Sequence, residues 1–224
     1  MLYLNLSELS FILGAKQVPL KGMDDKRQVT LLLAITKSGA VLPPQVIYAG
    51  LTDNCHPKFS FPDSWDIYHT PSHWSTEESM IRYIEKVIVP YVKHIRDEED
   101  LPLRQRALCI FDVFAAHRGK KLLELLDRKG IKVVFVPAAC TDRLQPLDLI
   151  PNNIFKSYLK SEFQTYYAGE VQKQLTDGVA LDEINIDLRT SSIKPLHAQW
   201  LVNAVEKLTL KPDMIVESFS KAGL

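Results

Sequence analysis

Apolar residues in the first part of the chain alternate with polar ones or gather in short blocks, which is typical of β-strands. Residues 2–9 alternate in this way, and residues 28–36 form a β-branched, apolar run that ends at a glycine turn. The pair Pro43-Pro44 introduces a third strand at residues 45–48. Joined by short connections, these segments predict an antiparallel meander of three strands.

Helical spacing begins after a loop rich in proline and tryptophan at residues 61–74. Ser75 and Glu78 fit a capping box, in which each side chain accepts from the other residue's amide. Apolar residues then recur every three or four positions as far as Ile95. Pro90 lies inside this pattern and is expected to kink the predicted helix without ending it.

Two later strands, at residues 107–114 and 131–136, are almost continuously apolar, which predicts burial on both faces. A predicted helix at 118–128 separates them, so the two strands should be parallel with a right-handed crossover. Further helices are expected at about 152–167 and 197–208. Residues 170–195 are mixed and polar, and they receive no assignment.

The predicted order β-β-β-α-β-α-β-α is typical of a ribonuclease-H-like α/β fold, with a mixed five-stranded sheet flanked by helices and extra C-terminal helices. We expect residues 1–168 to form this domain and residues 169–224 to be a helical extension of the same domain. In such a fold, acids from the first strand, the fourth strand and the helix after the fifth strand gather at one rim.

Composition narrows the choice of function only a little. Lysine plus arginine and aspartate plus glutamate number 27 each, which argues against a strongly basic nucleic-acid binder but allows a local patch. The three cysteines are widely spaced and indicate neither a disulfide framework nor a zinc ribbon, so we expect a reducing, intracellular setting. No apolar run approaches the roughly 20 residues that span a bilayer, so no membrane partner is expected.

The acids that could support chemistry lie at the ends of the predicted elements. Two-metal phosphoryl transfer needs carboxylates that hold divalent ions. Asp112 ends a central strand, where α/β sheets place ligands, although it could also cap the next turn or pair with Arg118. Asp148 precedes a predicted helix, so stabilisation of the helix dipole explains it equally well. Asp142 competes with Asp148 for the same role.

Two segments form motifs around the candidate acids. Residues 111–118 are Phe-Asp-Val-Phe-Ala-Ala-His-Arg, and residues 136–148 contain Thr-Asp-Arg-Leu-Gln-Pro-Leu-Asp. They resemble the second-aspartate motif and the third motif in the DDE superfamily endonuclease domains of pogo/Tigger-type transposases, which are related to centromere-protein-B-like proteins. Asp112 and Asp148 differ by 36 positions, as in the family, and further matches extend over residues 3–224. The resemblance favours Asp148 over Asp142.

The first motif departs from the family pattern, in which an asparagine is followed, after one residue, by the catalytic aspartate. Here the segment is Asn5-Leu6-Ser7-Glu8, so Ser7 stands where the aspartate belongs. Glu8 should point to the opposite face of the strand, and it could replace the acid only through a bulge or a one-residue slip. Because a neutral hydroxyl attracts a second cation less, we predict a degenerate, inactive site.

The resemblance also implies cofactors and partners. Active members of the family cut and rejoin DNA with three aspartates, so Asp112 and Asp148 would hold Mg²⁺ or Mn²⁺ if the site functions. DNA is the expected partner, together with nuclear proteins, and the nucleus the expected location. The basic cluster His117, Arg118, Lys120 and Lys121 could contact DNA phosphates, but a solvated first helical turn explains it equally well.

Two other classes of function stay open. In the first, the chain is a working Mg²⁺-dependent endonuclease in which Glu8 or a water completes the site. In the second, it is a protein-interaction module of a nuclear DNA-binding protein, and the old acidic rim is only structural. The chain contains no Walker sequence, no G-x-G-x-x-G and no G-x-S-x-G, so nucleotide hydrolysis, dinucleotide binding and serine hydrolysis have no support.

The histidines and tryptophans of the loop region carry weaker signals. His69 and His73 have the spacing of a helical metal pair, but Pro71 argues against a helix there, so we do not expect a zinc site. The pair Cys55-His56 has no ligand-type residue close by in the sequence and is interpreted as loop. Trp65 and Trp74 are expected to pack on the body of the domain.

Overall fold

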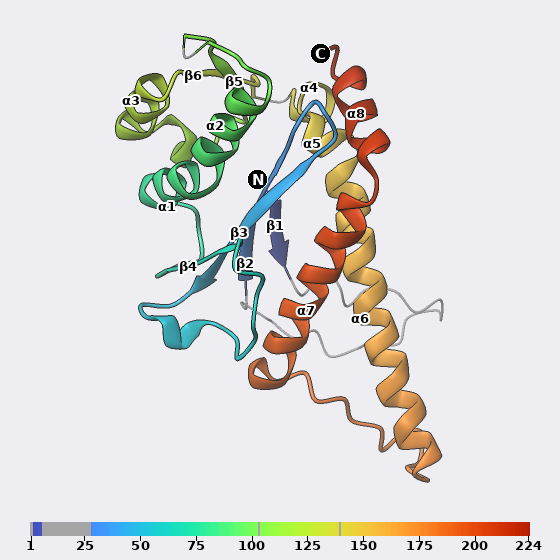
Figure 1. The fold of residues 1–224 in the computed structure, drawn as a ribbon. Coiled ribbons are helices and arrows are strands. Elements are labelled where there is room, and N and C mark those ends of the chain that lie inside the picture. Colours follow the sequence, from blue (N-terminus) through green and yellow to red (C-terminus); the bar gives the residue numbers. More distant parts are fainter. Residues whose placement is uncertain (1, 6–27, 103, 139) are drawn as a thin grey trace.

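The computed structural model describes residues 2–5, 28–102, 104–138 and 140–224. Its larger sheet has four strands in chain order: β1 (Leu2–Asn5), β2 (Gln28–Ile35), β3 (Val41–Ala49) and β4 (Asp66–Thr70). The first three strands are antiparallel neighbours, as predicted, and β4 adds to β3 in parallel (Figure 1). The sequence did not predict β4, because its five residues, Asp-Ile-Tyr-His-Thr, are mostly polar and follow a proline-rich loop.

A second sheet contains two parallel strands, β5 (Ala107–Phe111) and β6 (Ile131–Phe135), joined through α3 (Lys120–Arg128). The strand–helix–strand unit is as predicted, whereas the single five-stranded sheet is not confirmed. Within the described residues, β5 forms its ladder with β6, and β1 forms its ladder with β2. The mixed α/β class therefore holds, but the strands form two sheets.

The smaller sheet is also less covered than its sequence predicts. One face packs into an apolar cluster through Ala107, Cys109, Phe111 and Val133. On the other face, the Leu108 side chain is 58% exposed and Val134 is 45% exposed. The expectation of burial on both faces is therefore wrong, because a continuous apolar run does not show whether a second layer covers it.

The predicted helix after the loop exists as three consecutive segments: α1 (Glu77–Tyr83), a π-helical turn (Ile84–Ile88) and α2 (Val89–Glu98). Pro90 lies in the first turn of α2, directly after the π-helical turn, where its missing amide hydrogen is tolerated. The capping box is one residue later than predicted. Thr76 accepts from the Ser79 amide, and the Ser79 hydroxyl accepts from the Thr76 amide.

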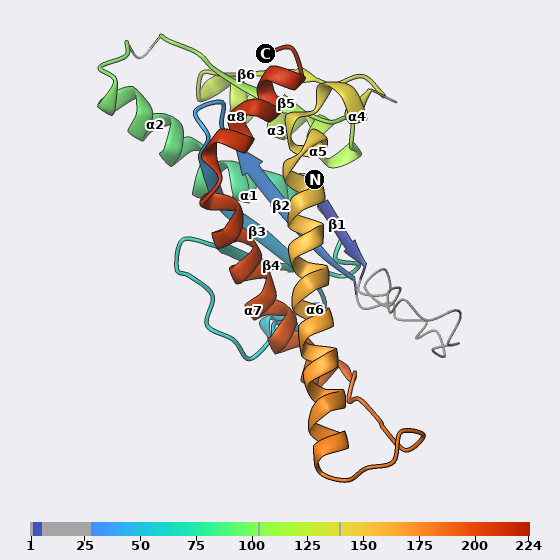
Figure 2. The same ribbon diagram turned by 90° about the vertical axis from the view of Figure 1, so that its right-hand side faces the viewer.

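Two long helices cover one face of the larger sheet, namely α6 (Pro151–Thr176) and α7 (Thr190–Thr209) (Figure 2). Short helices α4 (Thr141–Leu144) and α5 (Pro146–Leu149) precede α6, and α8 (Pro212–Lys221) lies against α5. Both α6 and α7 are longer than predicted. The last turns of α6 and the first turn of α7 lie in the polar stretch 170–195, where amphipathic spacing is weak.

Successive side chains of β2 point alternately into two hydrophobic cores, one on each face of the sheet. Leu31 and Leu33 pack against α6 and α7, whereas Leu32, between them, packs against α1 and α3. The prediction of helices on both faces of the sheet is therefore confirmed. Within the described residues, no helix is both long enough and apolar enough to cross a membrane.

Candidate active site

Asp112 directly follows Phe111, the last residue of β5. Its Oδ1 accepts from the Phe114 amide at 3.1 Å, which closes a local turn. The same oxygen accepts from His117 Nδ1 at 2.5 Å. The cap of the following turn, which the sequence allowed as a structural role for Asp112, is therefore present. In addition, Asp112 has a side-chain partner, His117.

His117 lies beneath this carboxylate and is only 3% exposed. Its ring stacks on Phe111, with centroids 4.9 Å apart, and meets the edge of Phe114 at 5.7 Å. Nδ1 carries the proton, because its partner is a carboxylate. Nε2 is buried and has no hydrogen-bond partner among the described residues. This geometry makes His117 a residue that positions Asp112.

The pKa of Asp112 results from opposing influences. Partial burial opposes ionisation, but the hydrogen bond from His117, nearby positive charge and the hydrogen bond from the Phe114 amide together outweigh it and lower the pKa from 3.8 to about 2. The carboxylate is therefore ionised at neutral pH and offers the hard, anionic oxygen that Mg²⁺ and Mn²⁺ prefer.

Replacing His117 with leucine, which keeps similar volume but cannot donate, is expected to raise the pKa of Asp112 from about 2 towards 3.8. The check is the pH dependence of the Asp112 carboxyl chemical shift. The exposed histidine of α2 gives a matched control, His94→Leu, which should leave that titration unchanged. An identical Asp112 titration in His117→Leu would contradict the assignment.

The same shift gives a signed prediction for stability. Since the folded pKa is depressed, Asp112 stabilises the fold fully above the unfolded pKa, and this contribution is lost as the pH falls through about 2. For this partly exposed carboxyl we expect a loss of about 1 to 2 kcal/mol after allowance for solvent screening. Asp112→Asn should lack that part of the acid dependence.

Asp148 lies on α5, and its Oδ1 accepts from the Asn152 side-chain amide. Asn152, on the first turn of α6, is buried, and its own Oδ1 has no partner among the described residues. The sequence did not single out Asn152. The i, i+4 spacing from Asp148 was the available signal, but an asparagine at a helix start has an ordinary explanation as a cap.

The described residues do not assemble a complete two-metal site. Asp112 and Asp148 are chemically suited to a divalent ion, yet neither belongs to a group of three potential ligands in the described part of the chain. Ser7 and Glu8, on which the first acidic position depends, lie outside the described residues, and so does the side chain of Asp142. A cation site at Asp112 and Asp148 therefore stays a prediction from the sequence, and so does its first acidic position.

The basic cluster beside Asp112 divides into buried and exposed parts. Arg118 donates to the Val113 carbonyl, and Lys120 and Lys121 are exposed at the start of α3. The Glu77 carboxylate of α1 accepts from the amides of Lys121 and Leu122. These two amides in the first turn of α3 are therefore already satisfied, so a phosphate here would contact the exposed side chains of Arg118, Lys120 and Lys121.

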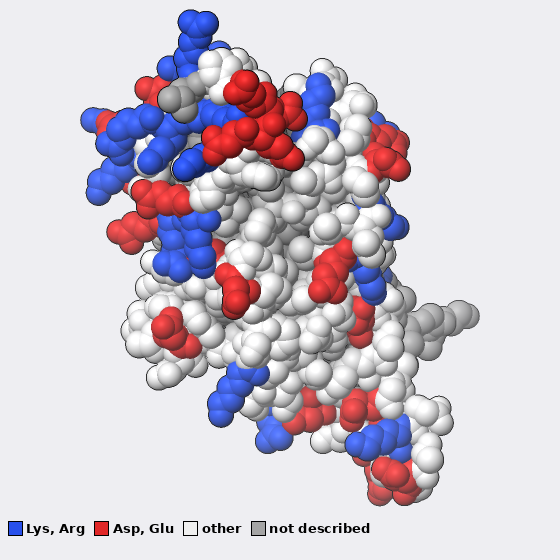
Figure 3. Space-filling view, in the orientation of Figure 1, with Lys and Arg blue, Asp and Glu red and all other residues white. Residues whose placement is uncertain are grey.

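Positive charge is concentrated in the segment that carries Asp112. Residues 104–132 contain eight lysines and arginines against three acids, although the whole chain is neutral. The eight basic residues are all exposed, and Figure 3 shows Lys and Arg gathered over this part of the molecule. Trp74, 44% exposed, stacks on Phe114 at 6.5 Å, whereas Trp65 is buried in the core. The packing prediction is thus confirmed for Trp65, while Trp74 presents a partly exposed aromatic surface beside Phe114, two residues after Asp112.

Comparisons with known proteins give the family. Residues 26–210 match the DDE superfamily endonuclease family, a span that includes Asp112 and Asp148 and begins after Ser7. The human protein named Pogo transposable element with ZNF domain is 27% identical over 194 residues, 87% of this chain and 12% of the relative. Pogo transposable element with KRAB domain is 23% identical in the mouse and 22% identical in the human protein, each over 201 residues and 89% of this chain.

The chain spans less than a third of the length of these curated relatives, since it covers 30% of the mouse protein and 29% of its human counterpart. No solved structure matches it. The family match nevertheless runs from just before β2 to the end of α7 and takes in both cores. The chain therefore belongs to the DDE superfamily endonucleases, as a domain of the pogo transposase type.

Proposed function

We propose that this chain is a transposase-derived DDE domain that binds DNA beside Asp112 and Asp148 and has lost efficient cleavage because Ser7 replaces the first aspartate. The proposal is carried by the Asp112–His117 pair. A hydrogen bond from the buried His117 imidazole favours the ionised form of the Asp112 carboxylate, which is the form that binds a cation. Hydrogen-bond partners of this kind typically orient the ligands of a metal site. Asp112 and Asp148 would hold Mg²⁺ or Mn²⁺, which would supply activation of the attacking oxygen and stabilisation of the leaving oxygen.

The charge distribution supports DNA as the partner. The exposed basic residues of 104–132 would contact phosphates, and Trp74 beside Phe114 could stack on a base at a strand end. His117 is too buried to reach a phosphate, so we now assign the phosphate contacts to Arg118, Lys120 and Lys121. By analogy with its relatives, we propose that the protein acts in the nucleus, with nuclear proteins as further partners. We also propose that residues 169–224 extend the same domain, because α7 shares a core with β2 and β3.

The test is cleavage of labelled DNA with Mg²⁺ or Mn²⁺ by the parent, Ser7→Asp and Ser7→Asp/Asp112→Asn. We expect an inert parent and a Ser7→Asp variant that cuts at least about 100-fold faster, the scale on which metal-site changes alter activity. The double variant should be silent again. The exposed acid at the end of α6 provides a matched control, since Ser7→Asp/Asp177→Asn should cut like Ser7→Asp.

Other outcomes identify the alternatives. If the parent already cuts as fast as Ser7→Asp, then Glu8 or a water completes a working site, and the chain is an active endonuclease. DNA binding, followed by fluorescence anisotropy in the same variants, separates the remaining classes. A chain that neither cuts nor binds DNA after Ser7→Asp would be a protein-interaction module.

A further inference from the structure

Three side chains that can bind a metal, the neighbours Cys55 and His56 and, 13 residues later, His69, meet near the ends of β3 and β4, away from Asp112. Cys55 and His56 end a short 3₁₀ turn, Asp53–Cys55, after β3, and His69 lies on β4. Parallel pairing of the two strands brings them together, with the Gly50 amide donating to the Thr70 carbonyl. The potential ligand atoms of Cys55, His56 and His69 all lie within 4.8 Å of one another.

The spacing of these atoms fits a tetrahedral ion. His69 Nδ1 lies 3.4 Å from His56 Nε2 and 3.3 Å from Asp53 Oδ1. Zinc binds nitrogen at about 2.0–2.1 Å and sulfur at about 2.3 Å, so neighbouring ligands around it lie about 3.3–3.6 Å apart. The pair of imidazole nitrogens and the pair formed by His69 Nδ1 and Asp53 Oδ1 are already at this separation. Asp53 Oδ1 lies 3.8 Å from the other ring nitrogen of His56, Nδ1, so side-chain rotations would have to bring both the Asp53 carboxylate and the Cys55 thiolate to the ion.

Burial and charge also suit a metal. The side chains of His56 and His69 are 19% and 24% exposed, while Asp53 is 87% exposed and forms the open side. Burial lowers the pKa of His56, which favours the neutral imidazole that binds metals. Burial also raises the pKa of Cys55, so the thiol would release its proton to solvent when a metal binds.

One cation faces the cluster. The Lys194 ammonium of α7 donates to the Cys55 carbonyl and lies 5.0 Å from the centroid of the Tyr48 ring. It repels a divalent ion, but it also stabilises a thiolate and ties the turn to α7. A site with one thiolate and one carboxylate carries two negative charges, which neutralise the ion despite this lysine.

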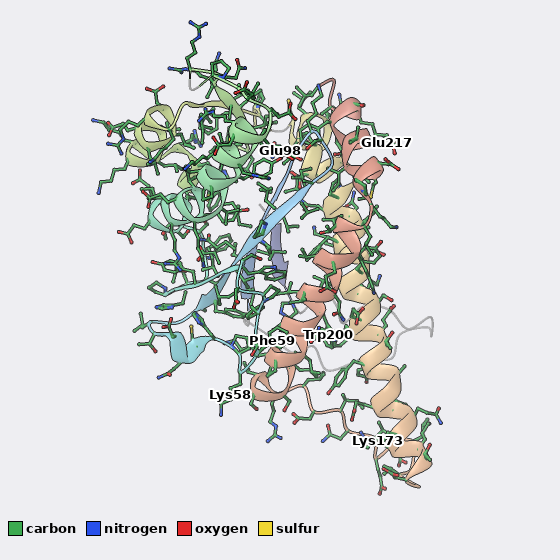
Figure 4. The ribbon with its side chains drawn as sticks, in the orientation of Figure 1. Lys58, Phe59, Glu98, Lys173, Trp200 and Glu217 are labelled. Carbon is green, nitrogen blue, oxygen red and sulfur yellow. The ribbon has the colours of Figure 1, made fainter. Side chains whose placement is uncertain are left out.

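We propose that Cys55, His56 and His69 form a zinc site, with Asp53 as the fourth ligand. Nitrogen and thiolate ligands select zinc over the magnesium that carboxylates prefer. Bound zinc would link the beginning of the 50–65 loop, through Cys55 and His56, to His69 on β4. Phe59 already anchors the rest of that loop in the core that contains Trp200, while Lys58 points outward (Figure 4).

The test titrates the full chain with Co²⁺ and Zn²⁺. We expect one ion per chain, a thiolate-to-cobalt charge-transfer absorption that zinc displaces, and a melting temperature that rises with zinc. Cys55→Ser should abolish the absorption. His56→Gln and His69→Gln should each weaken binding by at least the roughly 10- to 100-fold that loss of an outer-shell partner costs.

Matched controls keep the result specific. Cys140→Ser removes another free cysteine, and His94→Gln removes an exposed histidine, so both should bind zinc like the parent. Asp112→Asn should also leave zinc binding unchanged, which makes this outcome independent of the cleavage test. Circular dichroism in the absence of metal checks that each variant folds. Zinc binding that is equally tight in the parent and in Cys55→Ser, or absent from the parent, would overturn the proposal.

Discussion

Replacing Phe155 with alanine is expected to lower the free energy of unfolding by about 3–5 kcal/mol, the range for truncating a buried aromatic side chain. Phe155 is fully buried on α6 and belongs to the core that joins β2 and β3 to α7. Its loss removes apolar burial and leaves a cavity between layers that cannot close around it. Urea denaturation followed by circular dichroism measures the change.

The control for this variant is Leu175→Ala on the same helix, where the side chain is 39% exposed and lies near the C-terminal end. That change should cost less than about 1 kcal/mol, because little apolar surface is uncovered. A comparable loss in both variants would mean that α6 contributes to stability along its whole length and that the core around Phe155 is not its main anchor.

Removing both cations that contact Asp66 is expected to cost about 3–5 kcal/mol, because it leaves a buried carboxylate uncompensated. Asp66 begins β4 and is fully buried, with Arg82 Nε at 2.8 Å and Lys86 Nζ at 3.2 Å from its Oδ1. Gln45 on β3 donates to its Oδ2 at 2.6 Å. The variant Arg82→Met/Lys86→Met keeps most of the side-chain volume while removing both charges.

The single variants make this prediction sharp. Each alone should cost about 1–2 kcal/mol, because the other cation still faces Asp66, so the double loss should exceed the sum. Adding Asp66→Asn to the double variant should recover part of the stability, since a neutral amide costs less to bury than a charge. Additive, small losses and no recovery would show that Asp66 does not depend on these two cations.

These acids show where sequence reasoning reaches its limit. Asp112 was identifiable because it ends an apolar strand, and that strand is β5. Asp66 carried no signal, because it opens a short polar strand whose existence depends on pairing with β3. Its three side-chain partners, Gln45, Arg82 and Lys86, lie on three different elements, namely β3, α1 and the π-helical turn. Only the packed structure brings them to one buried carboxylate.

Capping shows the same division on a smaller scale. A capping motif before α1 was predicted from Ser75 and Glu78, and the structure places it at Thr76 and Ser79. The neighbouring Glu77 instead caps α3, whose first amides lie more than 40 residues later in the chain. Gly119 leaves the room that this carboxylate needs, since a Cβ there would lie 2.2 Å from the Glu77 oxygen. No local pattern contains such a contact.

By itself, the sequence determined the strands β2, β3, β5 and β6, the helix α3 between the last two, the family resemblance, and Asp112 and Asp148 as candidate acids. Those features depend on periodicity, turn residues and motifs that lie within short segments. Only the tertiary structure decided that the strands form two sheets, that His117 is buried beneath Asp112, and that Cys55, His56 and His69 converge. Each of these depends on which distant segments pair, and pairing is set by the packing of the whole chain.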